Sequence, residues 1–166
     1  ALLIFDEIVT GFRFHLGGAQ KLFGVTPDLA TFGKAMANGM PIAALVGKRA
    51  YMQKAEDIFF SFTFGGEALS LAAAIATIKE IERRGVIGAV WEMGEYLGAG
   101  TRRLISKHGL AKHVKLTGKP CRQVFIIPDL EIKSFIQQEL LQEGFLWYGS
   151  HNISFSHSKS ELARLL

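Results

Sequence analysis

The chain has 166 residues, of which 49% are hydrophobic and 20% charged, so it holds enough apolar side chains for a folded core and is not a disordered tail. Its net charge of +4 comes from basic residues scattered along the chain, which argues against nucleic-acid binding. Apolar runs end within about ten residues, which is too short for a membrane span. The chain has a single cysteine, Cys121, which excludes an intrachain disulfide and favours a reducing, cytoplasmic setting.

The first residues predict a buried parallel strand with acids at its carboxyl end. Residues 2–5 are all apolar and precede Asp6 and Glu7. Strands buried on both faces have such continuous apolar runs, and open α/β sheets bind ligands at the carboxyl ends of their strands. A central strand needs neighbours and covering helices, so we expect this chain to be the C-terminal part of a longer protein. Residues 161–166 likewise predict a helix that the chain's end interrupts.

The next segments predict short strands and one long helix. Glycines punctuate residues 11–24, which indicates a loop with short helical pieces. Residues 29–32 and 42–46 are apolar and predict two strands joined by an exposed turn. Residues 61–66 form a loop rich in aromatic residues and glycine, and residues 67–84 predict an alanine-rich helix whose terminal charges match the helix dipole.

The remaining residues predict a small α+β domain. A helix over 90–107 leads into it, so we place the domain boundary between residues 88 and 89. The predicted order that follows is strand 114–116, strand 123–127, helix 130–142, strands 145–148 and 153–156, and a final helix. One apolar stripe of the helix over 130–142 is expected to cover the sheet, and its members are Ile132, Phe135, Ile136 and Leu140.

Three side chains can carry chemistry. Asp6 at a strand end suits a cationic partner such as a protonated heterocyclic nitrogen, or it merely caps a loop. Lys34 stands among small and apolar residues, which favours a neutral, nucleophilic amine, although most lysines are solvated surface charges. The Thr63 hydroxyl, with the free amides of the following helix, can hold a phosphate or act as an ordinary cap. The aromatic neighbours Phe60, Phe62 and Phe64 would exclude water there.

Together these residues match one cofactor. A carboxylate, an amine and a hydroxyl are the anchors that pyridoxal phosphate needs for its ring nitrogen, its aldehyde and its phosphate. The five histidines lack the spacing of metal ligands, so we predict no metal site.

The sequence resembles a known family at the same positions. Residues 3–13, Leu-Ile-Phe-Asp-Glu-Ile-Val-Thr-Gly-Phe-Arg, resemble the DE-x-x-T-G-F-R signature of class III pyridoxal-phosphate aminotransferases of fold type I. Residues 16–20, 23–29, 33–34 and 39–41 continue the resemblance, most closely to the glutamate-1-semialdehyde 2,1-aminomutase branch. These ordered motifs cover residues 1 to about 80, whereas residues 90–166 match only in layout.

The resemblance implies a fold and a cofactor site. Residues 1–88 would be the C-terminal part of a three-layer α/β/α large domain with a mostly parallel sheet, and residues 89–166 a small α+β domain. Asp6 would pair with the pyridine nitrogen, Ile8 would pack on the ring face, and Lys34 would form the internal aldimine and then act as the base. Thr63, with the backbone of Phe62, would bind the cofactor phosphate across a dimer interface.

The implied activity is amino-group transfer. The amino group would pass to a second keto or aldehyde substrate, or to the neighbouring carbon of the same molecule. The implied partners are a small-molecule amine or amino acid and a second copy of the chain, in a homodimer with shared active sites.

Departures from the family pattern leave the substrate open. Residues 62–68 read Phe-Thr-Phe-Gly-Gly-Glu-Ala where the aminomutases have Gly-Thr-x-x-Gly-Asn-Pro, and Ala37 and Asn38 stand where they have glycines. His151 and Asn152 also replace acidic or small residues. Two alternatives follow: a noncatalytic folding and dimerisation fragment of such an enzyme, and a phosphate-binding regulatory domain that uses Thr63 without Lys34.

Overall fold

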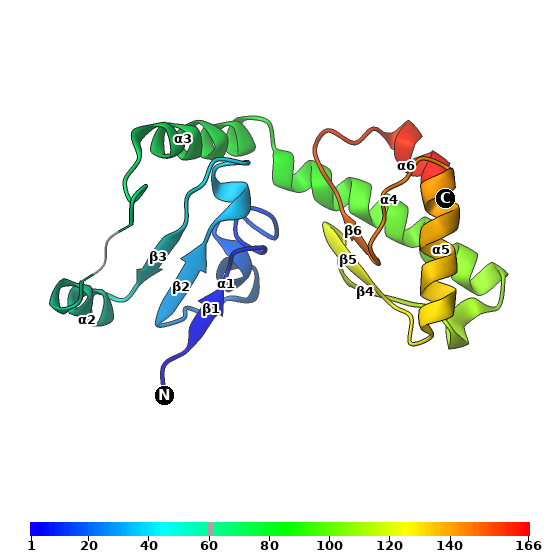
Figure 1. Ribbon diagram of the computed structural model, residues 1–166, viewed down its shortest axis with the longest axis horizontal. Coiled ribbons are helices and arrows are strands. Elements are labelled where there is room, and N and C mark those ends of the chain that lie inside the picture. Colours follow the sequence, from blue (N-terminus) through cyan, green and yellow to red (C-terminus); the bar gives the residue numbers. More distant parts are fainter. Residues whose placement is uncertain (60–61) are drawn as a thin grey trace. The chain divides into compact units, whose positions relative to one another are not determined.

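The structure is a computed structural model that describes residues 1–59 and 62–166. They fall into two units, Ala1–Ile87 and Gly88–Leu166 (Figure 1). Phe60 and Ser61, which belong to the predicted aromatic loop, lie outside the described residues.

A three-stranded sheet organises the first unit. Its order is β1 (Ile4–Asp6), β2 (Leu29–Phe32) and β3 (Ala44–Gly47). β1 runs parallel to β2 and β3 antiparallel to it, so the predicted parallel strand and the bounds of β2 are confirmed. The expectation that β1 is buried on both faces is not met in this chain, because Leu2, Leu3 and Ile4 are 49%, 46% and 56% exposed.

Helices and turns surround this sheet. They are α1 (Gly18–Phe23), the short 3₁₀ helix η1 (Lys34–Met36), α2 (Arg49–Met52), a second 3₁₀ helix η2 (Gln53–Asp57) and α3 (Ala68–Arg83). The predicted exposed turn between β2 and β3 is partly wrong. It contains η1, whose Met36 is buried with Ala37 against Ala74 of α3, so this connection belongs to the core.

The second unit is an antiparallel sheet with helices. Its elements are α4 (Val86–Lys107), whose first two residues belong to the first unit, η3 (Leu110–Lys112), β4 (Lys115–Lys119), β5 (Arg122–Ile126), α5 (Leu130–Gln142), β6 (Ser150–Asn152) and α6 (Lys159–Leu165). The strand order is β4-β5-β6. Val114, Ile127 and Trp147 form its core together with Ile132, Ile136 and Leu140 of α5. Phe135 of the predicted stripe is instead 62% exposed.

The chain after α5 differs from the prediction. Residues 145–148 are not a strand, because their backbone groups bond to α5. The Phe145 backbone amide donates to the Leu140 carbonyl at 2.8 Å, and the Gln137 side chain donates through Nε2 to the Trp147 carbonyl at 3.2 Å. The last strand is β6, three residues before the predicted 153–156. Ile153 is buried at 2% exposure, which explains the apolar signal without a strand.

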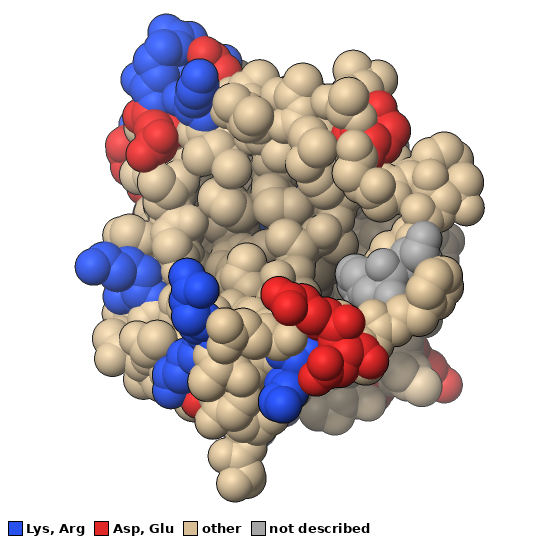
Figure 2. All heavy atoms as spheres, turned by 90° about the vertical axis from the view of Figure 1, so that its left-hand side faces the viewer, with Lys and Arg blue, Asp and Glu red and all other residues tan. Residues whose placement is uncertain are grey.

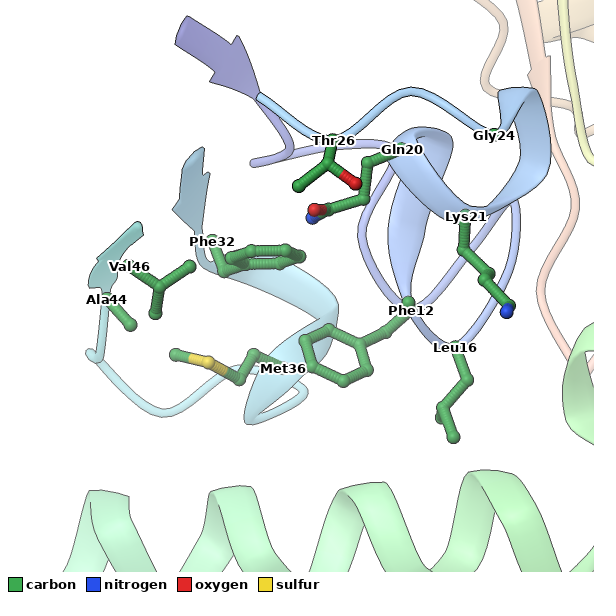
Figure 3. Close-up of a pocket in the computed structure, with 11 residues that line it drawn as sticks. Phe12, Leu16, Gln20, Lys21, Gly24, Thr26, Phe32, Met36, Ala44 and Val46 are labelled. Atoms are coloured by element: carbon green, nitrogen blue, oxygen red, sulfur yellow. The ribbon is translucent and has the colours of Figure 1, made fainter. Parts of the chain in front are cut away.

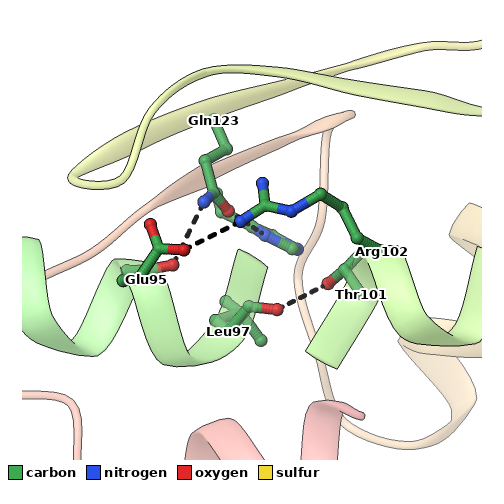
Figure 4. A network of polar contacts seen from close by, with 7 residues as sticks. Glu95, Leu97, Thr101, Arg102 and Gln123 are labelled. Carbon is green, nitrogen blue, oxygen red and sulfur yellow. Dashed lines mark hydrogen bonds and ion pairs between the residues drawn. The ribbon is translucent and has the colours of Figure 1, made fainter. Parts of the chain in front are cut away.

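The sheet of the second unit approaches α4 at two glycines. A Cβ at Gly94 would overlap the Pro120 carbonyl, and one at Gly98 would overlap the Gln123 side chain. Gln123 Nε2 donates to the Gly94 carbonyl at 3.1 Å, so the buried amide bonds to the helix backbone (Figure 4). Small residues on this face of α4 thus allow β5 to pack closely. In the described part of the chain, none of the helices is long and apolar enough to cross a membrane.

Candidate functional site

The carboxyl end of β1 presents Asp6. Asp6 lies opposite Thr31 of β2, is exposed, and its Oδ1 accepts the Ile8 amide at 3.0 Å. This bond fixes a tight turn directly after the strand. The Asp6 carboxylate is therefore held at the strand end, where the sequence predicted it, and is open to a ligand.

Lys34 follows the parallel neighbour of β1. Gly33 and Lys34 come directly after β2, so both residues lie at the same edge of the sheet as Asp6. A Cβ at Gly33 would lie 3.1 Å from the Ile8 Cδ1 atom, which means that Ile8 packs over the backbone next to the lysine. The structure thus brings Asp6, Ile8 and Lys34 to one edge.

The backbone of Lys34 has an unusual conformation. Its φ is +44°, in the left-handed region that favours glycine, and its carbonyl accepts the Ala37 and Asn38 amides at 3.3 and 3.1 Å. Backbone outliers of this kind cluster at functional sites. The side chain is exposed, so the apolar surroundings predicted for this amine are not present in this chain.

The segment before α3 carries Thr63. Thr63 and Phe62 are both exposed. The predicted free amides at the start of α3 are not free: Glu67 caps the helix and accepts the Leu69 and Ser70 amides at 2.6 and 2.8 Å. Hydrogen bonds from Ser70 and Leu69 lower the Glu67 pKa, so the cap is an anion. A phosphate beside Thr63 would therefore depend on the hydroxyl and the loop.

A cavity lies on the Asp6 face of the sheet. It has a volume of about 830 Å³, and its lining includes Ile8, Thr31, Leu45 and Phe62. Asp6 pairs with Thr31, and paired residues of neighbouring strands point to the same face, so Asp6 lies on this side. Figure 2 views the molecule from the side of α2 and β3, where an uncharged hollow lies between groups of charged side chains. The cavity thus brings two predicted cofactor residues, Ile8 and Phe62, together, whereas Asp6, Lys34 and Thr63 are not among its lining residues.

A second cavity of about 680 Å³ is lined by Phe32 of β2 and Val46 of β3, and Ala44 borders both cavities. Phe32 and Val46 point into it, whereas Thr31 and Leu45 line the first cavity, so the two cavities lie on opposite faces. Figure 3 shows Phe12, Phe32 and Met36 turned towards one another there. The Phe12 and Phe32 rings meet edge to face with centroids 5.8 Å apart.

Glu7 is a site residue that the sequence analysis did not single out. It is fully buried, and its carboxylate accepts hydrogen bonds from the Thr10 hydroxyl and from the Ala19 and Gln20 amides. Its partners lie up to 13 residues away, so no local pattern reveals them. The one signal in the sequence was the second acid after a buried strand, since a buried carboxylate requires hydrogen-bond donors.

Comparison with known sequences finds clear relatives. A family model described as Aminotransferase class-III matches residues 1–157. A 3-aminobutyryl-CoA aminotransferase of Cloacimonas acidaminovorans is 53% identical over 120 residues, which are 72% of this chain and 28% of that protein. Glutamate-1-semialdehyde 2,1-aminomutase 2 of Brevibacillus brevis is 33% identical, over 99% of this chain and 43% of that protein. The chain spans less than half the length of these relatives.

Solved structures share the fold of the chain. The PLP internal aldimine form of the Sphingopyxis sp. MTA144 FumI protein matches with a TM-score of 0.89 and 30% identity, over 99% of this chain and 40% of that one. A β-phenylalanine aminotransferase from Variovorax paradoxus, 24% identical, matches with a TM-score of 0.90 over 99% of this chain and 42% of that one. At that identity the second match speaks for the fold alone.

Proposed function

The chain belongs to the class-III aminotransferase family, and on that basis we propose that it supplies the lysine-bearing part of a pyridoxal-phosphate-dependent enzyme that transfers amino groups. The predicted family resemblance and the fold type I class are confirmed by the matches. One observation carries the proposal: Asp6 ends β1, Lys34 follows its parallel neighbour β2, and Ile8 packs over Gly33, the residue before Lys34.

The residues present fit the cofactor. Asp6, Lys34 and Thr63 offer an exposed carboxylate, amine and hydroxyl. Ile8 and Phe62 line the cavity of about 830 Å³, which lies within the usual size of small-ligand sites. Asp6 would hold the ring nitrogen, Lys34 the aldehyde carbon, and Thr63 with the Phe62 backbone the phosphate. Ile8 would contact one face of the ring.

Each residue has a chemical task in amino-group transfer. Bound pyridoxal phosphate supplies a ring that accepts electrons when the carbon–hydrogen bond beside the substrate amine breaks. The Asp6 carboxylate keeps a proton on the ring nitrogen, because an adjacent anion favours the charged form. The Lys34 amine accepts and returns the proton at the substrate carbon. Ile8 fixes the orientation of the ring and excludes water from that side.

The proposed partners are a small-molecule amine or amino acid and a second copy of the protein. Phe62 and Phe64, which flank Thr63, are 64% and 70% exposed, and an interface would cover them. Dimerisation would also place Thr63 at a shared site. The single cysteine, Cys121, is buried and suits a cytoplasmic location.

Borohydride trapping tests the proposal. The complete protein that carries this chain is incubated with pyridoxal phosphate, reduced with borohydride and mapped by peptide mass spectrometry. We expect an adduct on Lys34, lost in Lys34→Ala and kept in Lys21→Ala, whose lysine borders the opposite cavity. A folded protein without an adduct on Lys34 would refute the enzyme proposal and leave a noncatalytic fragment that keeps the fold.

A further inference from the structure

We infer that Glu7 is a positioning residue, which fixes the orientation of Asp6 and Ile8 towards the cofactor from the opposite face of the sheet. The inference rests on the proposed function. Asp6 and Ile8, the two expected ring contacts, are the immediate neighbours of Glu7 in the chain.

The polar groups of Glu7 are all bonded. Its amide donates to the Thr31 carbonyl of β2 at 2.9 Å, and its carbonyl accepts the Gly11 amide at 2.8 Å. Its Oε2 accepts the Thr10 hydroxyl and the Ala19 amide, the latter at 2.8 Å, and its Oε1 accepts the Gln20 amide at 2.9 Å. Glu7 thus joins β1, β2, the loop after β1 and the start of α1.

The surroundings of the carboxylate are shaped to hold it. Gly18 has a φ of +75°, and a Cβ there would lie 2.5 Å from the Glu7 Cδ atom. Only a glycine meets both requirements, because it tolerates the left-handed region and leaves room for the carboxylate. A Cβ at Gly11 would likewise lie 2.8 Å from the Glu7 carbonyl oxygen. Both glycines therefore bring the loop against Glu7.

The arrangement requires a carboxylate rather than an amide. The Ala19 and Gln20 amides point at different carboxylate oxygens, and both are donors. In Glu7→Gln one oxygen becomes an NH₂ group, which would face an N–H group and lose that bond. The substitution keeps size and shape, so it loosens the loop at α1 without emptying the core.

Loss of a hydrogen bond at the Glu7 carboxylate would alter the positions of the residues on the cofactor face, because these residues are joined to Glu7 through the backbone. The turn that sets Asp6 runs through Glu7, since Asp6 Oδ1 accepts the Ile8 amide across it. Ile8 in turn lies over Gly33, next to Lys34. A displaced Glu7 therefore shifts the positions of Asp6 and Ile8, although Asp6, Ile8 and Lys34 are themselves not mutated.

The experiment compares Glu7→Gln with Asp129→Asn in the complete protein. Asp129→Asn is the control for a carboxylate-to-amide change away from the site, at the start of α5 in the second unit, where the exposed Asp129 accepts the Glu131 and Ile132 amides with one oxygen, Oδ1, that asparagine keeps. The measurements are the dissociation constant of pyridoxal phosphate and the pH dependence of its visible absorption. Thermal unfolding of the apoprotein reports stability separately.

We expect Glu7→Gln to raise the cofactor dissociation constant at least tenfold and to shift the pH at which the absorption changes, while saturating cofactor still labels Lys34. Asp129→Asn should leave both cofactor measurements unchanged. A dissociation constant within twofold of wild type, with an unchanged absorption profile, would overturn the inference. If the wild-type protein gives no Lys34 adduct, the proposed function has failed instead, and the inference with it.

If Glu7→Gln does not fold, Thr10→Val tests the positioning role of Glu7 instead. It removes a single donor to the carboxylate and keeps the charge. A dissociation constant raised at least threefold is expected, and an unchanged constant in a folded protein refutes the positioning role.

Discussion

His151 is a titratable side chain that the second unit holds in its neutral form. Its ring is 7% exposed and meets Phe125 edge to face, with centroids 4.7 Å apart. Gln123 Nε2 donates to the Gly94 carbonyl, so Gln123 Oε1 is the acceptor for His151 Nδ1 at 3.2 Å. Burial disfavours the charged ring and lowers its pKa from 6.5 to about 4.

This shift predicts a loss of stability in acid. The unfolded chain binds a proton at His151 near pH 6.5 and the folded chain only near pH 4, so the free energy of unfolding falls as pH drops through that window. Below pH 4 the free energy of unfolding is lower by about 3 kcal/mol than it is above pH 6.5, as far as His151 contributes. Urea unfolding at a series of pH values should show a flatter dependence in His151→Gln.

The exposed His108 supplies the control. His108→Gln should keep the wild-type dependence on pH between 6.5 and 4. Equal slopes for the wild type and His151→Gln would contradict the assignment of this acid sensitivity to His151.

Among single residues, the sequence identified those with a local signature. Asp6 and Lys34 follow apolar runs, and Ile8 was placed by the family motif, so their common edge follows once β1 and β2 pair in parallel. Glu7 was missed because its importance depends on the Ala19 and Gln20 amides, which reach it only after α1 folds back. The cap of α3 was missed for a different reason, because Glu67 was interpreted only as a charge that matches the helix dipole, although its bonds to the Leu69 and Ser70 amides are local.

At the scale of the element, local signals again predicted best. β2 and α5 have the predicted bounds, because each is a bounded apolar or periodic run. Residues 145–148 are as apolar as a strand, yet their hydrogen bonds go to α5, and only the tertiary structure shows this. β6 was misplaced because its pairing with β5 selects Ser150–Asn152, which are polar residues.

α4 yields a prediction about its glycines. Alanine normally stabilises a helix by about 1 kcal/mol relative to glycine, and a methyl group added at Gly88 would have no other atom within 4 Å. Gly88→Ala should therefore stabilise the protein slightly. Gly94→Ala should destabilise it by several kcal/mol, because the methyl group would overlap the Pro120 carbonyl, which is backbone and cannot rotate away.

Chemical denaturation of the two variants measures the difference directly. Both changes add one methyl group to the same helix, so intrinsic helix propensity cancels in the comparison. Two variants of equal stability would show that the turn at Pro120 shifts freely and that the close approach is not required.

At the scale of the whole molecule, apolar surface is the dominant feature of the first unit. Phe59 is 97% exposed, Phe64 70% and Ile58 60%. Exposed clusters of this kind mark surfaces that associate. Because the site proposed for Thr63 is shared between two copies of the protein, we expect a second copy to cover these side chains.

The chain should therefore self-associate, and sedimentation velocity measures this. Phe59→Ser with Phe64→Ser should raise the dissociation constant for association by at least tenfold, because two large apolar side chains no longer leave water. The control is Leu130→Ser in the second unit, where Leu130 is 73% exposed and should contribute little. A wild-type chain that sediments as a monomer at micromolar concentration would contradict the prediction.

The left-handed backbone at residue 34 has a consequence for protein engineering. Glycine would adopt this conformation at lower cost than lysine. A redesign guided by thermal stability alone would therefore favour Lys34→Gly, and it would delete the one amine on which the proposed chemistry depends. Lysine persists at a position where local energetics prefer another residue, which is the pattern expected when function rather than folding selects the side chain.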